Sequence, residues 1–341
     1  MKKSIRRLGL HVAAAAASVG GVLERRRRRR LRKSGGRVFV LEYHDVSAGG
    51  AEPEGTISAQ RFGNHLDSLR AKHQVVPLSE AIGALTSSDR LESDLVAVTF
   101  DDGYLENYTT AWPELRDRGL SGAIFLTSGF LDGDELWFDA ARRLLQQVRS
   151  SPEVLTPLAT SSLARIFGKW PLFTETEHLV EHLKYVDIAE RDELLHMLRE
   201  AVETAPAAMQ PLTWDQVREM GAQGMEFGGH TVTHPILSML DAAAQEREIE
   251  SSASRVREEL GRDDRLFAYP NGSERDYDGN TLEIVRRLDF IGACTTTTGS
   301  NAPGSDPYQL RRIGVGPDPV HVLEARLGGL FDAEMRRLLP V

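Results

Sequence analysis

Two adjacent aspartates follow the most strongly apolar run of the chain. Asp101 and Asp102, with Gly103 after them, come directly after residues 95–100. Two carboxylates beyond a buried strand are costly unless positive charge lies close by, and a divalent metal ion would supply that charge. One aspartate can then bind the metal while the other stays free as a base. The alternative is an aspartate that caps the following helix, and for this segment taken alone the cap is the favoured interpretation.

Two histidines four residues apart form the second segment. On a helical turn, the spacing of His230 and His234 puts both imidazoles on one side, which suits a metal ion. Zinc proteases share this spacing but need Glu directly after the first histidine, where Thr231 stands, so a protease is not expected. One carboxylate and two histidines leave open positions for water and substrate. The same ligands could hold iron in an oxygenase, and a chance histidine pair is the remaining alternative.

The elements that must position these residues alternate between strands and helices, which implies parallel β-α-β units. The carboxyl ends of parallel strands in a barrel meet on one face. The aspartate pair and the histidine pair are therefore candidates to meet there, as is a Pro-Asn-Gly turn at 270–272. Apolar runs predict strands at 38–41, 75–78, 95–100, 123–126, 225–228, 266–269, 291–294 and 310–315. Helices are predicted at 58–72, 79–85, about 104–118, 240–260, 280–288 and 322–339, with Ser58 and Gly119 as caps.

The chain divides into a basic tail, residues 1–36, and one catalytic domain, residues 37–341, in which 132–213 is a helical insertion. A length of 341 residues with 41% hydrophobic residues is enough for one large core. The net charge is -9, yet residues 1–37 contain 13 Lys and Arg and only Glu24 as an acid. The body is therefore strongly acidic and is not expected to bind nucleic acid.

The tail is expected to be solvated and disordered, and peripheral contact of residues 1–37 with an anionic membrane is the alternative. Nucleic-acid binding by the tail is not expected, since no aromatic residue is interleaved with its charges. The first residues of the tail resemble a signal peptide, but their apolar stretch is short. A run of arginines from Arg25 to Arg30 follows this stretch directly. Such a run favours a cytoplasmic or cytoplasmic membrane-surface location over secretion. The single cysteine, Cys294, fits a reducing compartment without proving one.

Together the segments resemble the polysaccharide deacetylase family, also known as carbohydrate esterase family 4 or the NodB-homology domain. That family has Thr-Phe-Asp-Asp-Gly, then His-(Ser/Thr)-x-x-His-Pro, then a strand that ends in a Pro-x-Gly turn, and all three occur here in this order. Residues 41–46, 137–139 and 310–315 resemble an exopolysaccharide-processing branch. The resemblance covers residues 37–330. It implies an α/β fold, a distorted (β/α) barrel with about seven strands.

The resemblance also implies roles for individual residues. Asp102, His230 and His234 would bind zinc or a similar divalent ion, and Asp101 would be the general base. The backbone N–H of Tyr104 is the candidate donor to the oxyanion of the tetrahedral intermediate.

Two positions depart from the family pattern. Many members have an arginine that orients the base where Ala268 stands, and a late histidine that supplies the acid, which His321 does not match. In the branch with a Tyr-His opening, the histidine near the first strand takes that role, so we expect His44 as the general acid. The alternative is a core histidine that caps the first strand. Arg311 or Arg312 is the candidate replacement for the missing arginine.

The leading hypothesis is a hydrolase of carbon–nitrogen bonds other than peptide bonds. It would remove N-acyl groups, chiefly acetyl, from amino sugars of a polysaccharide or lipid-linked glycan, so its partner would be an N-acetylated glycan. One alternative is a catalytically inactive carbohydrate-binding module of the same fold. Another is a membrane-surface protein whose basic tail is the functional part.

Overall fold

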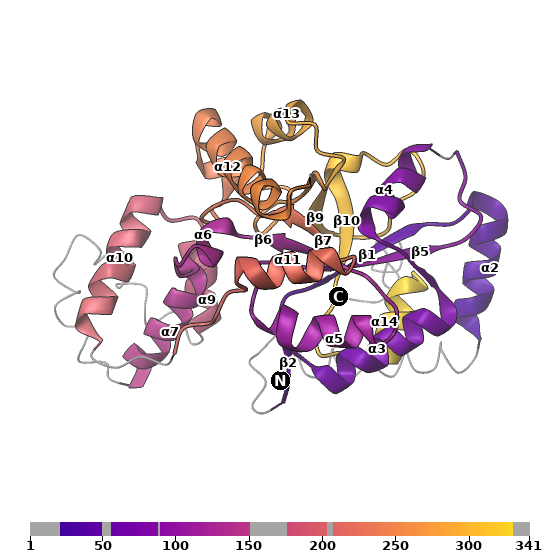
Figure 1. Ribbon diagram of the computed structural model, residues 1–341, viewed down its shortest axis with the longest axis horizontal. Coiled ribbons are helices and arrows are strands. Elements are labelled where there is room, and N and C mark those ends of the chain that lie inside the picture. Colours follow the sequence, from indigo (N-terminus) through magenta and orange to yellow (C-terminus); the bar gives the residue numbers. More distant parts are fainter. Residues whose placement is uncertain are drawn as a thin grey trace, which may run out of the picture.

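Seven parallel strands close into a barrel at the centre of the molecule (Figure 1). The computed structural model describes residues 21–49, 56–87, 89–150, 176–202, 207–262 and 264–329. The ring runs in the order β1, β10, β9, β8, β7, β6, β5, and pairing of β1 with β5 closes it. The prediction of a distorted barrel with about seven strands is therefore confirmed. The barrel strands are β1 (Val38–Tyr43), β5 (Leu95–Phe100), β6 (Ala123–Leu126), β7 (Glu226–Gly229), β8 (Leu266–Ala268), β9 (Gly292–Thr298) and β10 (Leu310–Gly314).

The continuous apolar runs form strands because the barrel strands are covered on both faces. Every residue of β1 and β5 is buried, as is usual for parallel strands between helices and a filled interior. The predicted strand at 75–78 is shorter, since β4 (Gln74–Val75) pairs only with the start of β5. Pro77 has no N–H to extend the ladder, and the N–H groups of Leu78 and Ser79 donate to the Glu226 carboxylate instead. A separate pair of short strands is formed by β2 (Val46–Ser47) and β3 (Ile57–Ser58).

Helices surround the barrel, and their apolar faces pack on its outer surface (Figure 1). Ser58 precedes the first of them, but its side chain makes no capping hydrogen bond. The predicted helix before Gly119 begins with one π-helical turn, η1 (Asn107–Ala111). The predicted final helix is described only over α14, and residues 330–341 lie outside the described part. The helices are α3 (Ala59–Lys72), α4 (Leu78–Ser87), α5 (Trp112–Arg116), α6 (Ser128–Leu131), α11 (Trp214–Ala222), α12 (Ala242–Leu260), α13 (Gly279–Arg287) and α14 (Val320–Leu327), with single 3-10 turns at η5 (Leu237–Met239) and η6 (Pro307–Gln309).

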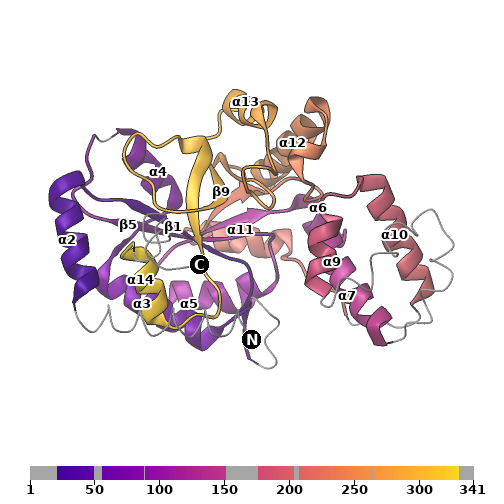
Figure 2. The ribbon, with the colours of Figure 1, turned by 180° about the vertical axis from the view of Figure 1, so that it is seen from behind.

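The segment 132–213 projects from one end of the barrel with a hydrophobic cluster of its own (Figures 1 and 2). Its described residues form α7 (Trp137–Ser150), α9 (Thr176–Leu183) and α10 (Ile188–Ala201) and contain no strand. Residues 151–175 and 203–206 of this segment lie outside the described residues. Tyr104 and Phe130 from the barrel side belong to the same cluster, so the insertion is packed against the strand ends.

The basic segment before the barrel differs from the expectation. Residues 22–34, expected to be disordered, form the helix α2 (Val22–Ser34). Arg27 and Arg30 each place guanidinium nitrogens 2.8 Å from the carboxylate of Asp94, which is 1% exposed. A buried carboxylate needs positively charged partners, and these ion pairs hold α2 against the barrel. Residues 1–20 lie outside the described part, and within it no helix is long and apolar enough to cross a membrane.

Candidate metal and catalytic site

The turn after β5 separates the two adjacent aspartates. Asp102 has a φ of 73° and Gly103 a φ of 93°, both in the left-handed region. Glycine adopts this region freely and aspartate more readily than most other residues. The carbonyl of Asp102 accepts a hydrogen bond from Thr127 at the end of β6, 3.2 Å away. The turn is thus fixed to the neighbouring strand, and the two carboxylates have different surroundings.

The two histidines lie on a loop after β7, so the predicted helical turn is wrong. Thr231 has a φ of 66° and His234 a φ of 55°, and these left-handed residues, not helical spacing, bring the imidazoles together. The loop is bonded to α6, where Gly129 N–H donates to the carbonyl of Val232 over 3.0 Å. A Cβ at Gly129 would lie 2.6 Å from that carbonyl oxygen, so the close approach requires glycine.

Glu248 of α12 holds the same loop from its other side. Its carboxylate accepts the N–H groups of Val232 and Thr233 and the hydroxyl of Thr233, at 2.8, 3.0 and 2.8 Å. The side chain of Thr231 accepts the N–H of His234 over 3.1 Å. No sequence pattern singles out Glu248, because it is one of many charged residues on a helix whose exposed face is expected to be charged.

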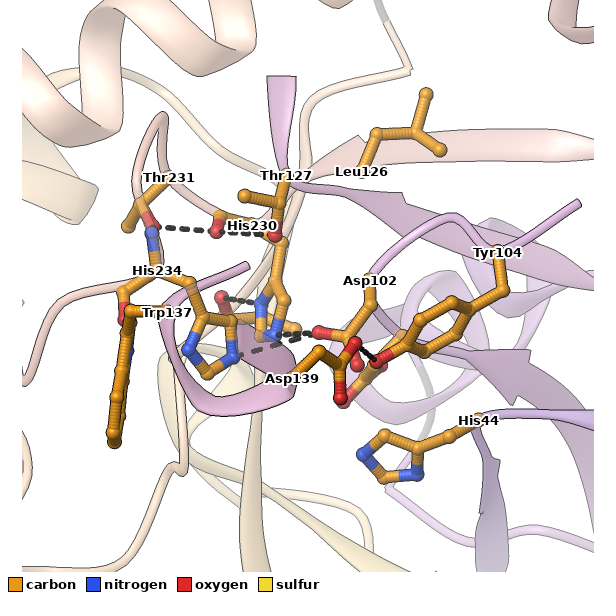
Figure 3. A network of polar contacts seen from close by, with 12 residues as sticks. His44, Asp102, Tyr104, Leu126, Thr127, Trp137, Asp139, His230, Thr231 and His234 are labelled. Carbon is orange, nitrogen blue, oxygen red and sulfur yellow. Dashed lines mark hydrogen bonds and ion pairs between the residues drawn. The ribbon is translucent and has the colours of Figure 1, made fainter. Parts of the chain in front are cut away.

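The three predicted ligands meet at the carboxyl ends of the strands (Figure 3). The Nε2 atoms of His230 and His234 lie 3.6 and 3.5 Å from Oδ1 of Asp102, and all three side chains are buried. Nδ1 of His230 donates to the carbonyl of Ala268 over 2.7 Å, which leaves the Nε2 lone pair directed at the cluster. The turn predicted at 270–272 therefore follows a strand that supplies a backbone acceptor to the site.

The charges of this cluster fit a cation. Burial raises the pKa of Asp102 to about 7, and burial lowers the pKa of His230 to about 4 and that of His234 well below its usual value. The histidines are thus neutral, and Oδ1 of Asp102 has no hydrogen-bond partner among the described residues. Three buried groups that can each offer a lone pair thus face one another, and the carboxylate lacks the hydrogen bonds that a buried charge needs. A divalent metal ion, for which two imidazoles and a carboxylate are common ligands, fits this arrangement.

Asp101 is held by a buried arginine from the last barrel strand. Nη1 and Nη2 of Arg312 each donate to one oxygen of the Asp101 carboxylate over 2.7 Å. Burial would raise the pKa of Asp101, but Arg312 and, next, His230 outweigh it and hold this pKa well below its usual range. Arg312, which also donates to the carbonyl of Thr295 over 2.9 Å, is fully buried. The neighbouring Arg311 points away, toward Gly299.

His44 lies just beyond β1, beside a second carboxylate. Its side chain is 51% exposed, so it is not a core histidine, and its Nε2 lies 3.9 Å from Oε1 of Glu42. Partial desolvation lowers the pKa of His44, but the carboxylates of Asp102, Asp101 and Glu42 outweigh it, and the net shift is upward. Glu42, His44 and Asp101 bring ligand-type atoms within 4.8 Å of one another. They do not form a second metal site, because the guanidinium of Arg312 already pairs with both carboxylates.

The insertion contributes three consecutive residues to the site, of which Figure 3 shows Trp137 and Asp139. Trp137 Nε1 donates to the carbonyl of His234 over 3.0 Å, and the Phe138 ring packs edge-on against the His234 imidazole with 4.8 Å between centroids. Asp139 accepts the hydroxyl of Tyr104 over 2.7 Å. In the sequence, residues 137–139 are distinguished only by their resemblance to the exopolysaccharide-processing branch, which assigns them no role.

The remaining predicted residues divide between the site and the scaffold. The ring of Tyr104 is buried, while its backbone N–H has no hydrogen-bond partner within the described ranges. His321 lies on α14, which packs against α3. Two further aspartates follow the turn at 270–272. Asp276 accepts hydrogen bonds from Ser273 and the insertion's Tyr185, and Asp278 caps α13, so both are structural.

A cavity of about 390 Å³ lies behind the histidine loop, between this loop and the insertion. Val232 and Thr233 line one wall, and Trp137 and Arg191 line another. The guanidinium of Arg191 covers the Trp137 ring at 4.4 Å from its centroid. The insertion therefore forms part of a cavity wall, but none of the three predicted metal ligands lines this cavity.

The barrel and its strand-end cluster define a (β/α)-barrel protein with a candidate metal centre of one carboxylate and two histidines. The sequence profile of the family described as polysaccharide deacetylase matches residues 172–292. YxkH of Bacillus subtilis, described as a polysaccharide deacetylase, is 21% identical over 279 residues, which cover 82% of this chain and 71% of YxkH. With the motifs at Asp101, Asp102, His230 and His234 in place, the chain is similar to the polysaccharide deacetylase family, whose profile matches it over residues 172–292.

Solved structures show the same fold. IcaB from Ammonifex degensii superposes with a TM-score of 0.59 and 23% identity, over 86% of this chain and 98% of that one. The Streptococcus pyogenes deacetylase PplD, solved with acetate, gives a TM-score of 0.58 and 20% identity, over 86% of this chain and 99% of that one. At these identities the likeness supports the barrel architecture.

Proposed function

We propose that this protein is a metal-dependent hydrolase that removes N-acetyl groups from amino sugars of a polysaccharide. The observation that carries the proposal is the cluster of Asp102, His230 and His234 beside the ion-paired Asp101. The match of residues 172–292 to the polysaccharide deacetylase profile and the similarity to YxkH support the reaction class. Zinc is the proposed metal, since two imidazoles and one carboxylate leave an open position in a zinc site.

An ion held by Asp102, His230 and His234 would supply Lewis-acid chemistry, which activates a water molecule and polarises the amide carbonyl. Asp101 accepts a proton from the attacking water, whose oxygen bonds to the carbonyl carbon. Arg312 fixes the direction of the Asp101 carboxylate by its two parallel hydrogen bonds. The charge that develops on the carbonyl oxygen is stabilised by the backbone N–H of Tyr104.

Departure of the sugar amine requires a proton. His44 is the proposed donor, because it lies beside the carboxylates at the open end of the barrel and its pKa is raised. The carbon–nitrogen bond breaks as the nitrogen takes this proton, and acetate and a free amino sugar are the products. Before this transfer, Glu42, 3.9 Å from His44, faces the positive charge of the protonated ring.

Replacement of His44 with Ala is expected to lower kcat about 100-fold or more, since a general acid contributes roughly 10²–10⁴. An acid must be protonated, so the native rate should fall as pH rises through the pKa of His44, and this alkaline fall should disappear in the variant. Metal content, measured by mass spectrometry, should stay at the native level. The matched control is His196→Ala, at an exposed position on α10. Native turnover in His44→Ala would rule out this role.

The function itself is tested by acetate release from N-acetylglucosamine oligomers with metal-replete protein. We expect acetate and free amine in equal amounts, and no release from O-acetylated sugars that lack an N-acetyl group. The alternative is a catalytically inactive carbohydrate-binding module of the same fold. Binding of the oligomers without any acetate release, at full metal content, would support that alternative.

We also propose that residues 1–37 bring the protein to an anionic membrane, at its cytoplasmic surface. The high positive charge of this segment supports the contact. Each basic residue close to such a surface contributes about 1 kcal/mol.

A further inference from the structure

Helix α2 is fixed to the barrel by one of its sides. Arg27 and Arg30 pair with the buried Asp94, which also accepts the N–H of Arg37 over 2.9 Å. At the carboxyl end of the helix, Nη2 of Arg90 donates to the carbonyl of Leu31 over 2.5 Å. The helix therefore has a defined position on the body of the protein.

The opposite side of α2 is a continuous basic face. At 100° per residue, six exposed basic residues fall within about half of the helix circumference. Glu24, paired with Arg28 over 2.6 Å, is the only acid on the helix. Arg29, Arg32 and Lys33 have no ion pair or hydrogen bond with any residue of the described ranges. The basic face consists of Arg25, Arg26, Arg28, Arg29, Arg32 and Lys33.

This basic face and the metal site lie at opposite ends of the barrel. Asp94, the anchor of α2, directly precedes β5, and Asp101 and Asp102 directly follow it. A strand of this length spans about 20 Å. Figures 1 and 2 agree, since α2 lies at one extreme of the molecule and the insertion, which contacts the metal site, at the other.

We propose that the basic face of α2 binds an anionic lipid surface and holds the barrel with its metal site turned away from the bilayer. The remainder of the chain is acidic and is repelled by the same surface, so the charge distribution sets one orientation. No aromatic residue lies on α2, which disfavours single-stranded nucleic acid as the occupant. Since this rests on the proposed function, the substrate is the amino sugar of a chain that extends beyond the headgroups, not a sugar linked directly to a lipid.

Binding is measured by sedimentation with phosphatidylcholine vesicles that contain either no phosphatidylglycerol or about 30% of it. The variant Arg29→Gln/Arg32→Gln/Lys33→Gln should bind the anionic vesicles about 100-fold more weakly, roughly fivefold for each charge removed. The matched control, Arg70→Gln/Arg116→Gln/Arg247→Gln, removes the same charge from exposed positions elsewhere and should bind as the native chain does. Equal binding by both variants, or native binding to neutral vesicles, would overturn the proposal.

Orientation is measured with single cysteines that carry a fluorophore, Ser34→Cys on α2 and His196→Cys on the insertion; the native Cys294 is buried. A quencher on the lipid headgroups should quench the label at position 34 and leave the label at 196 unaffected. Quenching of both labels, or of 196 alone, contradicts the orientation.

Acetate release from a soluble and from a lipid-linked substrate is then compared with the protein bound to the same anionic vesicles. Acetate should be released from long soluble N-acetylglucosamine oligomers and not from a vesicle-borne N-acetylglucosaminyl lipid. Release from that lipid overturns the inferred substrate class. No release from either substrate, with vesicle binding and label quenching as expected, would instead reject the proposed function and leave the lipid contact standing.

Discussion

Asp101→Asn is expected to lower kcat for acetate release by about 10³-fold, within the range that a general base contributes. The amide has nearly the shape of the carboxylate but cannot take up the proton of the attacking water. Because the three metal ligands are unchanged, metal content should remain at the native level. Initial rates on N-acetylglucosamine oligomers and metal analysis of the same sample measure both quantities. A variant with native kcat would remove Asp101 from the mechanism.

The substitution also leaves the buried guanidinium of Arg312 without its carboxylate, which is itself destabilising. The triple variant Glu42→Gln/Asp101→Asn/Arg312→Met removes the guanidinium and both carboxylates that it pairs with, and keeps most of the volume. It should fold at least as well as the single variant and stay equally inactive. Asp215→Asn, at an exposed position on α11, is the matched control and should keep full activity.

His234→Ala is expected to abolish tight metal binding and, with it, acetate release. It removes one of three ligands, and the two that remain cannot hold an ion against dilution as a three-ligand site does. Mass spectrometry should find about one metal ion per native chain and almost none in the variant. Chelation of the native protein should abolish acetate release in the same way. Added zinc should then restore the rate of the native protein but not that of His234→Ala.

His196→Ala again serves as the control, since this exposed histidine pairs only with Glu200 among the described residues. Two outcomes would contradict the assigned site. One is full metal content in His234→Ala, and the other is a native rate that does not respond to a chelator.

The meeting of Asp102, His230 and His234 could be predicted because their motifs stand at the ends of apolar strands, and strand ends of a parallel barrel meet. The reason given for the histidine pair was nevertheless wrong, since a loop with two left-handed residues replaces the helical turn. Arg311 and Arg312 were equal candidates in the sequence. Side chains alternate along a strand, and the register of β10 decides that Arg312 points inward and Arg311 outward.

Residues that act through long-range contacts left no local signal. Glu248 reaches the histidine loop from α12, and nothing in its immediate sequence distinguishes it from other surface acids. Asp139 reaches the site from α7, and its sequence signal was only the resemblance of residues 137–139, which assigned it no role. The expected disorder of 22–34 was wrong for the same reason. A run of arginines predicts a solvated chain unless a buried acid lies elsewhere in the fold, and Asp94 is such an acid, distant in sequence.

The ion pair between Asp101 and Arg312 joins β5 to β10, the strands on either side of β1 in the closed ring. The base and its partner are therefore supplied by opposite halves of the chain and meet only once the ring is complete. Hydrolytic competence therefore depends on closure of the whole ring, since Asp101 gains the cation that orients it only where β5 and β10 lie on either side of β1.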